Sequence, residues 1–343
     1  MKIVFLVASY MPHQIVSIRA LLDNYDVEIH SFSVSKNYTY VPGNIEGLVT
    51  YPPGQFHSDK LYTEILKINP KLVVVAGWFI KDFVNVSKKI RKELDIPVVS
   101  YSDTQWTGSI KQKINTIISP WFLKKTFSHI WVAGIYQYEY ARKLGFRKEK
   151  ILYNGLSCDV KLFNKVSTEK KRKEYPKKFI FVGRFVEVKG LDNLLNAWRQ
   201  IKDKRGWKLS MIGDGPLKEQ FLNDNSIIVN DFMPHNELIQ EMQNSGCFIL
   251  PSVFEPWALV IHEAVAAGLP VIATTICGAT PHFVINNWNG YSINTEVQNL
   301  KEAMQKIMLA DSKQLYDFSI HSKRIAENIT PEIGAANLMS IVL

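Results

Sequence analysis

Short apolar runs and helical hydrophobic patterns alternate along almost the whole of this chain. The apolar runs of the first half predict strands near residues 2–8, 27–34, 72–76, 97–101, 129–133 and 151–153. Between them, apolar residues that recur every three to four positions predict helices near 14–23, 60–67, 83–94, 110–127 and 136–144. Strands that alternate with helices are typical of βαβ units, so the pattern predicts a parallel sheet.

The same rhythm begins again after a charged stretch, residues 165–178, which lacks apolar periodicity and contains Pro176. Strands are predicted near 178–182, 208–212, 227–229, 247–250 and 270–273, and helices near 191–202, 217–222, 236–243, 256–267, 297–309, 313–328 and from 331 onward. We therefore expect two doubly wound, Rossmann-like α/β domains that face each other across a cleft, and ligands bound beyond the carboxyl ends of their strands. The expected boundaries are 1–164 for the first domain, joined by a C-terminal helix in 330–343, 165–178 for a linker and 179–329 for the second domain.

The composition is that of a globular protein, with 46% hydrophobic and 21% charged residues. The longest apolar run covers only residues 72–80, whereas a membrane-spanning helix needs about 20 residues. The first eight residues are more typical of a buried strand than of a signal peptide. Three cysteines far apart in the sequence, Cys158, Cys247 and Cys277, argue against a metal cluster and favour a reducing compartment. We therefore expect a cytoplasmic protein.

The net charge of +9 lies entirely in the first half of the chain. Residues 1–166 hold 22 Lys and Arg against 13 Asp and Glu, whereas residues 167–343 hold 19 of each. Within the basic half, residues 110–127 interleave lysines with isoleucines, Trp121 and Phe122. This pattern predicts either a helix that lies on the anionic inner face of a membrane or an ordinary basic face above a buried apolar one. Nucleic acid binding is not expected, because no nucleic-acid module accompanies the charge.

Candidate chemistry concentrates in residues 253–278. A helix is predicted from Pro256 to a stop at Gly268, which places Glu255 at the helix entrance and Glu263 two turns further along, about 12 Å away along the axis. Free N–H groups at such an entrance attract phosphate, and the second carboxylate is placed to reach a pair of ribose hydroxyls. The alternative is that the two glutamates are an ordinary cap and a solvated side chain.

Three further loops follow predicted strands of the second half. Gly183-Arg184 and Lys189-Gly190 put two cations at the carboxyl edge of the sheet, where they are able to pair with a diphosphate; a surface basic pair is the alternative. The loop with Gly213 and Gly215 allows either close approach of backbone to a ligand or a plain turn. Phe232 and Met233 offer a ring and backbone amides to a base, although Phe232 is equally consistent with a core position.

The order of these motifs resembles that of the retaining nucleotide-sugar glycosyltransferases with the GT-B fold, glycosyltransferase family 4. The matching pieces are Gly183-Arg184 with Lys189-Gly190, the 213–216 loop, and Glu255 to Glu263 followed by residues 266–272. The resemblance implies that Arg184 and Lys189 hold the donor diphosphate and stabilise the leaving group, where most of the developing charge lies. It implies that Glu263 binds the ribose, and that Glu255 binds the donor sugar together with main-chain N–H groups of Trp257, Ala258, Leu259 and Val260.

The chain departs from the family pattern at several positions. Ala258 replaces a glycine that is usual there, and Trp257 is bulkier than the common Phe. In the first half, the family often has a His that faces the donor sugar after a middle strand; residues 101–106 have none, and Asp103 is the candidate substitute. His13, in the segment that replaces a glycine-rich loop, is a candidate contact to the acceptor or to phosphate, although a single His is more often structural.

The chain contains no Asp-x-Asp pair, so we expect no metal and no other cofactor besides a nucleoside-diphosphate sugar as donor substrate. The expected function is retaining transfer of a hexose-type sugar from a UDP- or GDP-sugar to a hydroxyl of a glycan or lipid-linked glycan, in cell-surface polysaccharide assembly. The first domain would bind this acceptor. A nucleotide-sugar epimerase of the same fold and a non-catalytic sugar-nucleotide-binding protein remain the alternatives. A nicotinamide dehydrogenase is disfavoured, because no Gly-x-Gly-x-x-Gly follows the first strand.

Overall fold

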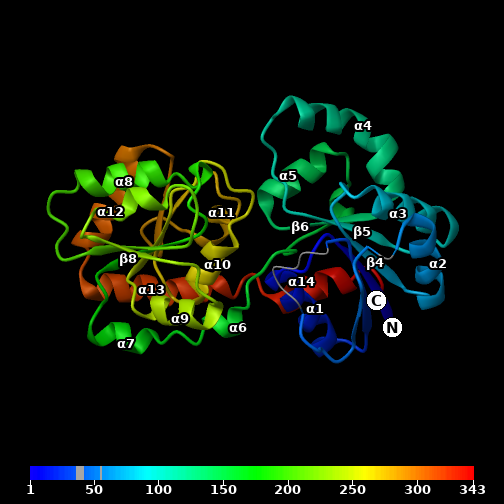
Figure 1. The fold of residues 1–343 in the computed structure, drawn as a ribbon, viewed down its shortest axis with the longest axis horizontal. Coiled ribbons are helices and arrows are strands. Elements are labelled where there is room, and N and C mark those ends of the chain that lie inside the picture. The colour runs from blue at the N-terminus through cyan, green and yellow to red at the C-terminus, as the bar shows by residue number, and fades with distance from the viewer. Residues whose placement is uncertain (36–41, 55) are drawn as a thin grey trace. The chain divides into compact units, whose positions relative to one another are not determined.

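The computed structural model describes residues 1–35, 42–54 and 56–343, which form two compact units. The first unit consists of residues 1–157 together with 329–343, and the second of residues 158–328. Each unit is built on one parallel sheet with helices packed on its faces (Figure 1). The expected pair of doubly wound α/β folds is therefore confirmed.

The first unit contains a seven-stranded sheet in the order β3-β2-β1-β4-β5-β6-β7, and every neighbouring pair of strands is parallel. Its elements are β1 (Lys2–Val7), α1 (Pro12–Asn24), β2 (Glu28–Ser33), β3 (Leu48–Tyr51), α2 (Ser58–Ile68), β4 (Leu72–Ala76), α3 (Lys81–Glu93), β5 (Val98–Ser102), α4 (Ile110–Thr126), β6 (His129–Val132), α5 (Ile135–Lys143), η1 (Lys148–Lys150), β7 (Ile151–Leu152) and α14 (Pro331–Met339). Because the order reverses at β1 and β4, the loops after these strands diverge, which leaves room for a ligand at this edge.

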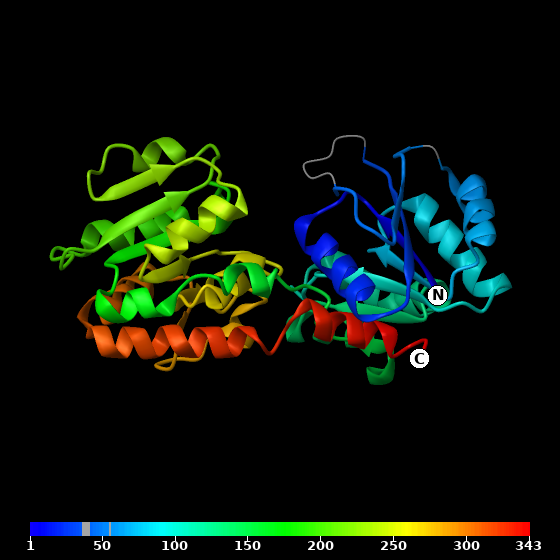
Figure 2. The same cartoon turned by 90° about the horizontal axis from the view of Figure 1, so that it is seen from below.

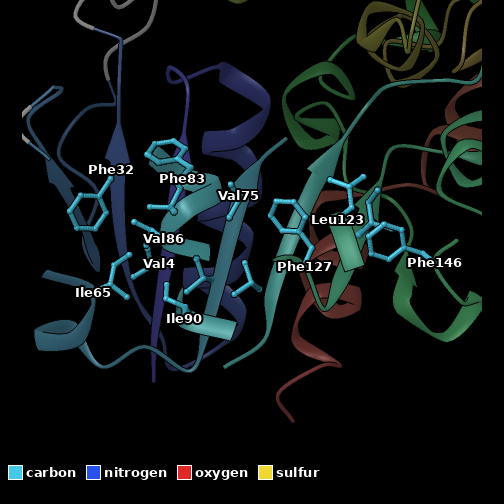
Figure 3. Close-up of a cluster of buried hydrophobic side chains, with 14 of the residues drawn as sticks. Val4, Phe32, Ile65, Val75, Phe83, Val86, Ile90, Leu123, Phe127 and Phe146 are labelled. Atoms are coloured by element: carbon cyan, nitrogen blue, oxygen red, sulfur yellow. The ribbon is translucent and has the colours of Figure 1, made fainter. Parts of the chain in front are cut away.

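Hydrophobic clusters cover both faces of this sheet. Successive side chains of β1 point to opposite faces, so Val4 and Leu6 join one cluster and Ile3 and Phe5 the other. The first cluster packs the sheet against α2, α3, α4 and α5, and Figure 3 shows part of it, from Val4 across to Phe146. The second cluster packs the sheet against α1 and α14. Helices on both faces are the physical reason why the central strands β1 and β4 are nearly all apolar.

The C-terminal helix α14 belongs to the first unit and packs beside α1, as Figure 2 also shows. Thr330 caps the helix by accepting a hydrogen bond from the Ile333 N–H at 3.2 Å, and Pro331 occupies its first turn. A Cβ at Gly334 would lie 2.6 Å from the carbonyl oxygen of Asn154, so this glycine allows the helix to approach the chain closely. The expected return of the last helix to the first domain is confirmed.

The second unit contains a six-stranded parallel sheet in the order β10-β9-β8-β11-β12-β13. Its elements are α6 (Val160–Phe163), α7 (Thr168–Lys173), β8 (Lys178–Val182), η2 (Glu187–Lys189), α8 (Leu191–Gln200), β9 (Lys208–Ile212), η3 (Lys218–Phe221), β10 (Ile227–Asn230), α9 (His235–Gln243), β11 (Cys247–Leu250), α10 (Leu259–Ala266), β12 (Val271–Thr274), α11 (Thr280–Phe283), β13 (Gly290–Ile293), α12 (Val297–Leu309) and α13 (Ser312–Ala326). The order reverses between β8 and β11, so the loops that follow these two strands are the ones placed to hold a ligand.

Residues 165–178, expected to form a linker, contain α7 and pack on the second unit. Tyr175 is buried, and its hydroxyl donates a hydrogen bond to the carbonyl oxygen of Gly246 at 2.8 Å. Lys171 is also buried, with its ammonium donating to the carbonyl oxygen of Met242 at 3.3 Å. A buried lysine does not contribute to a hydrophobic pattern, which explains why the sequence of this stretch lacks apolar periodicity.

Candidate active site

The loops after β8, β9 and β10 lie against one another at the carboxyl edge of the second sheet. The N–H of Gly183 donates to the carbonyl oxygen of Ile212 at 3.0 Å, and the N–H of Gly213 donates to that of Asn230 at 3.0 Å. A Cβ at Gly213 would lie 1.9 Å from the carbonyl oxygen of Gly183, and one at Gly215 would lie 2.6 Å from that of Phe185. These glycines therefore hold neighbouring loops together by close backbone packing.

Lys189 and Glu255 form an ion pair at this edge. The N–H groups of Val253 and Phe254 both donate to the carbonyl oxygen of Val188, at 2.9 and 3.3 Å, and these bonds draw the loop after β11 against η2. Both charged side chains are 15% exposed. Because the pair is partly shielded from water, it interacts more strongly than a pair on the open surface.

The helix predicted from Pro256 begins three residues later, at Leu259, so the expectation that Glu255 sits at a helix entrance is wrong. The backbone of residues 255–258 makes hydrogen bonds outside the helix. The carbonyl oxygens of Glu255 and Trp257 accept hydrogen bonds from the N–H groups of Gly278 and Ala279, at 3.2 and 2.8 Å. The chain turns into α10 at Ala258, whose φ of +79° lies in the left-handed region. Only Glu263 therefore belongs to the helix, and the two carboxylates do not share one axis.

The left-handed conformation at Ala258 is one that glycine adopts without strain, which agrees with the glycine that the resemblance implies at this position. A residue with a Cβ is strained there by about 1–2 kcal/mol, whereas glycine is not. The segment nevertheless keeps this conformation, because its backbone is tied to residues 278 and 279 and the side chain of Trp257 is buried. The indole N–H of Trp257 is buried and has no hydrogen-bond partner among the described residues. The sequence analysis considers only the size of Trp257 and not this polar group.

Glu263 is buried in the middle of α10, and this burial raises the pKa of its carboxyl group to about 7. The imidazole Nε2 of His235 lies 3.8 Å from Glu263 Oε1. Burial lowers the pKa of His235, so the imidazole is neutral near pH 7 and does little to stabilise the carboxylate. Sequence reasoning missed His235, because a single His at the start of a helix carries no signal of its own.

α10 is held in place by His262. The Nδ1 atom accepts a hydrogen bond from the Cys158 N–H at 3.2 Å, so Nε2 carries the proton and donates it to the carbonyl oxygen of Ala326 at 3.1 Å. The ring stacks on Phe283 at a centroid distance of 4.3 Å, and burial lowers the pKa of His262 to about 4. A neutral His262 thus fixes the helix that carries Glu263.

The remaining predicted residues of the second unit lie on the surface of the same loops. The side chain of Arg184 is exposed, on the connection that leads to Lys189. Phe232, after β10, is 80% exposed, so it is not a core residue and its ring is open to a ligand. Met233 beside it is half-buried.

The first unit has a pocket of about 610 Å³ at the carboxyl edge of its own sheet. Its lining comes from the segments after β1, β4 and β5 and from α4 and α5: Ala8, Ser9, Met11, His13, Gln14, Ala76, Gly77, Trp78, Phe79, Tyr101, Ser102, Asp103, Thr104, Ser109, Lys111, Gln112, Asn115 and Tyr140. The structure therefore brings the two predicted residues of this half, His13 and Asp103, to one pocket.

His13 lies in the first turn of α1, and its ring stacks on Tyr101 with a centroid distance of 6.4 Å. Burial lowers the pKa of His13 to about 4, so the imidazole is neutral at pH 7 and is suited to hydrogen bonding rather than to pairing with a phosphate charge. The hydroxyl of Tyr101 is buried and finds no hydrogen-bond partner in the part of the chain that the structure describes. Sequence reasoning passed over Tyr101 in favour of the charged Asp103 two residues later.

The described residues contain neither a cluster suited to a metal ion nor a helix suited to cross a membrane. No group of three or more His, Cys, Asp or Glu side chains among residues 1–35, 42–54 and 56–343 is arranged to hold a metal ion. No helix in the same ranges is both long enough and apolar enough to cross a membrane.

Comparison with known proteins assigns a family to the second unit. Residues 163–328 match the family of glycosyl transferases group 1. An uncharacterized 41.2 kDa protein from the cps region of Klebsiella pneumoniae is 28% identical over 238 residues, which cover 65% of this chain and 64% of that protein. The amylovoran biosynthesis glycosyltransferase AmsD of Erwinia amylovora is 26% identical over 160 residues, 44% of each chain. The chain spans about half the length of the curated relatives that it matches.

Solved structures extend the likeness to both units. HepE from Anabaena, in complex with UDP-glucose, has a TM-score of 0.70 and 18% sequence identity, with 100% of both chains covered. This likeness concerns the fold, and it confirms the GT-B class that the order of motifs had implied.

Proposed function

Because this chain belongs, through residues 163–328, to the glycosyl transferases group 1 family, we propose that it transfers a hexose-type sugar from a nucleoside-diphosphate sugar to a hydroxyl group of a glycan or lipid-linked glycan. The second unit binds the donor and the first binds the acceptor. The observation that carries the proposal is the ion pair of Lys189 and Glu255 at the carboxyl edge of the second sheet.

Lys189 and Arg184 bind the donor diphosphate. An ammonium has three hydrogens, so its contact with Glu255 leaves two that are able to reach phosphate oxygens. Breaking the bond from the anomeric carbon to the phosphate places negative charge on the leaving nucleoside diphosphate. Cations that are already in position stabilise this charge without reorganising, which is the largest contribution of the site to the rate.

Glu255 binds hydroxyl groups of the donor sugar, next to the phosphates that Lys189 holds. The backbone N–H groups of Trp257, Ala258, Leu259 and Val260 complete this part of the site, at the start of α10 where N–H groups have no partner within the helix. Gly183 and the 213–216 loop form the neighbouring wall. The bulk of Trp257, which is buried against His282 at a centroid distance of 5.4 Å, restricts which sugars fit.

Glu263 binds the ribose hydroxyls, and Phe232 and Met233 contact the base. A buried carboxylate without a strong partner gains two hydrogen bonds from a ribose, which offsets part of the cost of its burial. We propose UDP-glucose as the first donor to test, because the fold neighbour HepE was solved with it. The relatives from a cps region and from amylovoran biosynthesis favour a role in cell-surface polysaccharide assembly.

The reaction retains the configuration of the sugar. The acceptor hydroxyl attacks the anomeric carbon from the face that the diphosphate leaves, and an oxygen of the departing phosphate takes the hydroxyl proton. In the first unit, the neutral imidazole of His13, the carboxylate of Asp103 and the hydroxyl of Tyr101 line the pocket that orients the acceptor. No step needs a metal ion, so turnover in EDTA should equal turnover in Mg²⁺.

The test is an assay of purified protein with UDP-glucose, UDP-galactose and GDP-mannose, each with and without a panel of octyl glycosides as acceptors. We expect release of nucleoside diphosphate that depends on the acceptor, and NMR of the product should show the anomeric configuration of the donor. Rearrangement of the donor sugar without any acceptor would instead indicate an epimerase. Donor binding without turnover, under all conditions and with membrane lipid extracts as acceptors, would indicate a non-catalytic binding protein.

A further inference from the structure

Helix α4 buries mainly polar side chains and exposes apolar ones, which is the reverse of an ordinary surface helix. Its buried positions are Gln112, Ser119, Leu123 and Thr126, three of which are polar. Hydrogen bonds satisfy this buried side: Gln112 Nε2 donates to the carbonyl oxygen of Gln105 at 2.7 Å, and Ser119 Oγ donates to that of Leu144 at 2.6 Å. The helix is therefore held to the first unit by polar contacts as well as by Leu123 and Phe122, next to α3 and α5 (Figure 1).

The opposite side of α4 carries an apolar stripe that nothing covers in the described structure. The stripe consists of five residues, each between 49% and 78% exposed: Ile110, Ile114, Ile117, Ile118 and Trp121. At about 100° per residue, these side chains fall within an arc of roughly 100° on one face of the helix. Five large apolar side chains in one row are not the scattered exposure that is normal on a surface, so the stripe indicates a docking surface.

The charges of α4 indicate what docks there. The helix contains four lysines and no acidic residue. On the same angular scale, Lys113 and Lys124 flank one border of the stripe, Lys111 flanks the other, and Lys125 lies beside Ile118. An apolar row bordered by cations fits the boundary between anionic head groups and acyl chains, where the isoleucines enter the apolar layer and the lysines stay at the phosphates.

We propose that the α4 stripe docks this chain on an anionic lipid leaflet. A second copy of the chain fits the stripe less well, because two such faces would bring lysines against lysines with no carboxylate on either helix to pair with them. Trp121 supports the choice of a membrane, since an indole has an apolar body and a polar N–H and favours the interface between water and lipid.

The same helix also lines the pocket of the first unit, through Ser109 at its cap and through Lys111, Gln112 and Asn115. Docking by α4 therefore places the mouth of this pocket near the lipid head groups. If the proposed function holds, the acceptor is accordingly a lipid-linked glycan. The docking itself does not depend on the proposed function and is measured without any enzyme assay.

The experiment is co-sedimentation of the purified chain with vesicles of phosphatidylcholine alone or with 30% phosphatidylglycerol (about one anionic lipid in three), at low and at physiological salt. We expect binding to the anionic vesicles, which weakens as salt screens the lysines. The double variant Ile117→Glu with Trp121→Glu should lose at least about tenfold in affinity, because it places two acids where an anionic interface must accept apolar side chains. Leu309→Glu with Leu222→Glu is the matched control, since both leucines are exposed in the second unit.

The charge contribution is tested by Lys113→Gln with Lys125→Gln, which should weaken binding several-fold and reduce its dependence on salt. Lys202→Gln with Lys313→Gln, exposed lysines of the second unit, should bind as the unaltered chain does. The proposal is overturned if the chain ignores anionic vesicles, or if the Ile117 and Trp121 variant binds like the control. It is also overturned if analytical ultracentrifugation shows a dimer that this variant alone dissociates. Circular dichroism of each variant verifies that the fold is intact.

Discussion

The ammonium of Lys189 contacts the carboxylate of Glu255 although the two residues are 66 positions apart. The contact exists because the loop after β11 hydrogen-bonds to the carbonyl oxygen of Val188, one residue before the lysine. It fixes a cation and an acceptor of hydrogen bonds side by side, which is the arrangement that a sugar diphosphate requires. Because the ammonium of Lys189 and the carboxylate of Glu255 act together, the effects of removing each charge on turnover should not be additive.

We predict that Lys189→Met lowers the rate of donor turnover by at least about a hundredfold, because one preorganised cation at the leaving group contributes on the order of 3 kcal/mol to stabilising the transition state. Glu255→Gln should lower turnover as well, and the double variant should be less impaired than the sum of the two single effects. Steady-state kinetics of the four proteins measure this cycle. Lys202→Met, which removes an exposed lysine of the same unit, is the control and should leave turnover unchanged; strictly additive losses would contradict the coupling.

The affinity for the donor should rise with pH because of Glu263. Ribose hydroxyls donate stronger hydrogen bonds to the ionised carboxylate than to the neutral carboxyl group, and the pKa of this group in the free protein is about 7. The dissociation constant for UDP-glucose should therefore fall by up to about tenfold between pH 6 and pH 8, as the ionised fraction rises. Burial lowers the pKa of His235 from its ordinary value, and the diphosphate diester of the sugar nucleotide does not titrate in this window. Isothermal titration should find weaker and pH-independent binding in Glu263→Gln; an unchanged pH profile in that variant would assign the effect elsewhere.

The same carboxyl group affects the stability of the protein with the opposite sign. Its pKa rises from 4.5 in the unfolded chain to about 7 in the folded one, so the folded state prefers the protonated form. The resulting contribution to stability is present below pH 4.5 and is lost as the pH rises through 7. This change corresponds to at most about 3.4 kcal/mol. Urea unfolding should therefore show that Glu263→Gln gains stability relative to the unaltered chain as pH goes from 5 to 8. A difference that does not change with pH would mean that the folded protein does not raise this pKa.

His262 should matter to stability without touching the donor. Replacing it with Leu keeps an apolar side chain against Phe283 but leaves the buried N–H of Cys158 and the carbonyl oxygen of Ala326 without their partner. Each lost partner costs about 1–3 kcal/mol, so we expect a clear loss in the free energy of unfolding, measured by urea denaturation. His57→Leu, a substitution of an exposed imidazole, should change it little. Equal effects of the two variants would show that the buried hydrogen bonds contribute nothing.

Hydrophobic periodicity predicts most of the helices and strands. It fails where a strand is only partly buried and where distant contacts set the end of a helix. The edge strands β3 and β13 are only partly buried, so their residues do not form apolar runs and neither strand was predicted. Pro256 signals a helix start, but the backbone of 255–258 is tied to residues 278 and 279 and delays α10 to Leu259. Contacts between distant loops decide this boundary, and a local pattern does not contain them.

The candidate site divides in the same way. Glycines and charged residues after strands identify Gly183, Lys189 and Glu255, since parallel strands bring such loops to one edge. Tyr101 and the indole N–H of Trp257 are noticed only when their burial and the absence of a partner among the described residues are known. His235 is noticed only when its approach to Glu263 is known. For α4, the sequence is equally consistent with a helix that lies on a membrane and with a basic face above a buried apolar face. The exposure of the isoleucines excludes the covered face, because the buried side is the one with Gln112 and Ser119.

The central claim is that the carboxyl edge of the second sheet binds a nucleoside-diphosphate sugar, and thermal unfolding in a panel of such donors tests it most directly. A ligand present at 100 times its dissociation constant stabilises the folded state by about 2.7 kcal/mol, which raises the midpoint by a few degrees. We predict that at least one nucleotide sugar, with UDP-glucose the first candidate, raises the midpoint of the unaltered chain and fails to raise that of the double variant Lys189→Met with Glu255→Gln. No shift with any nucleotide sugar, or an equal shift in the double variant, would contradict the account.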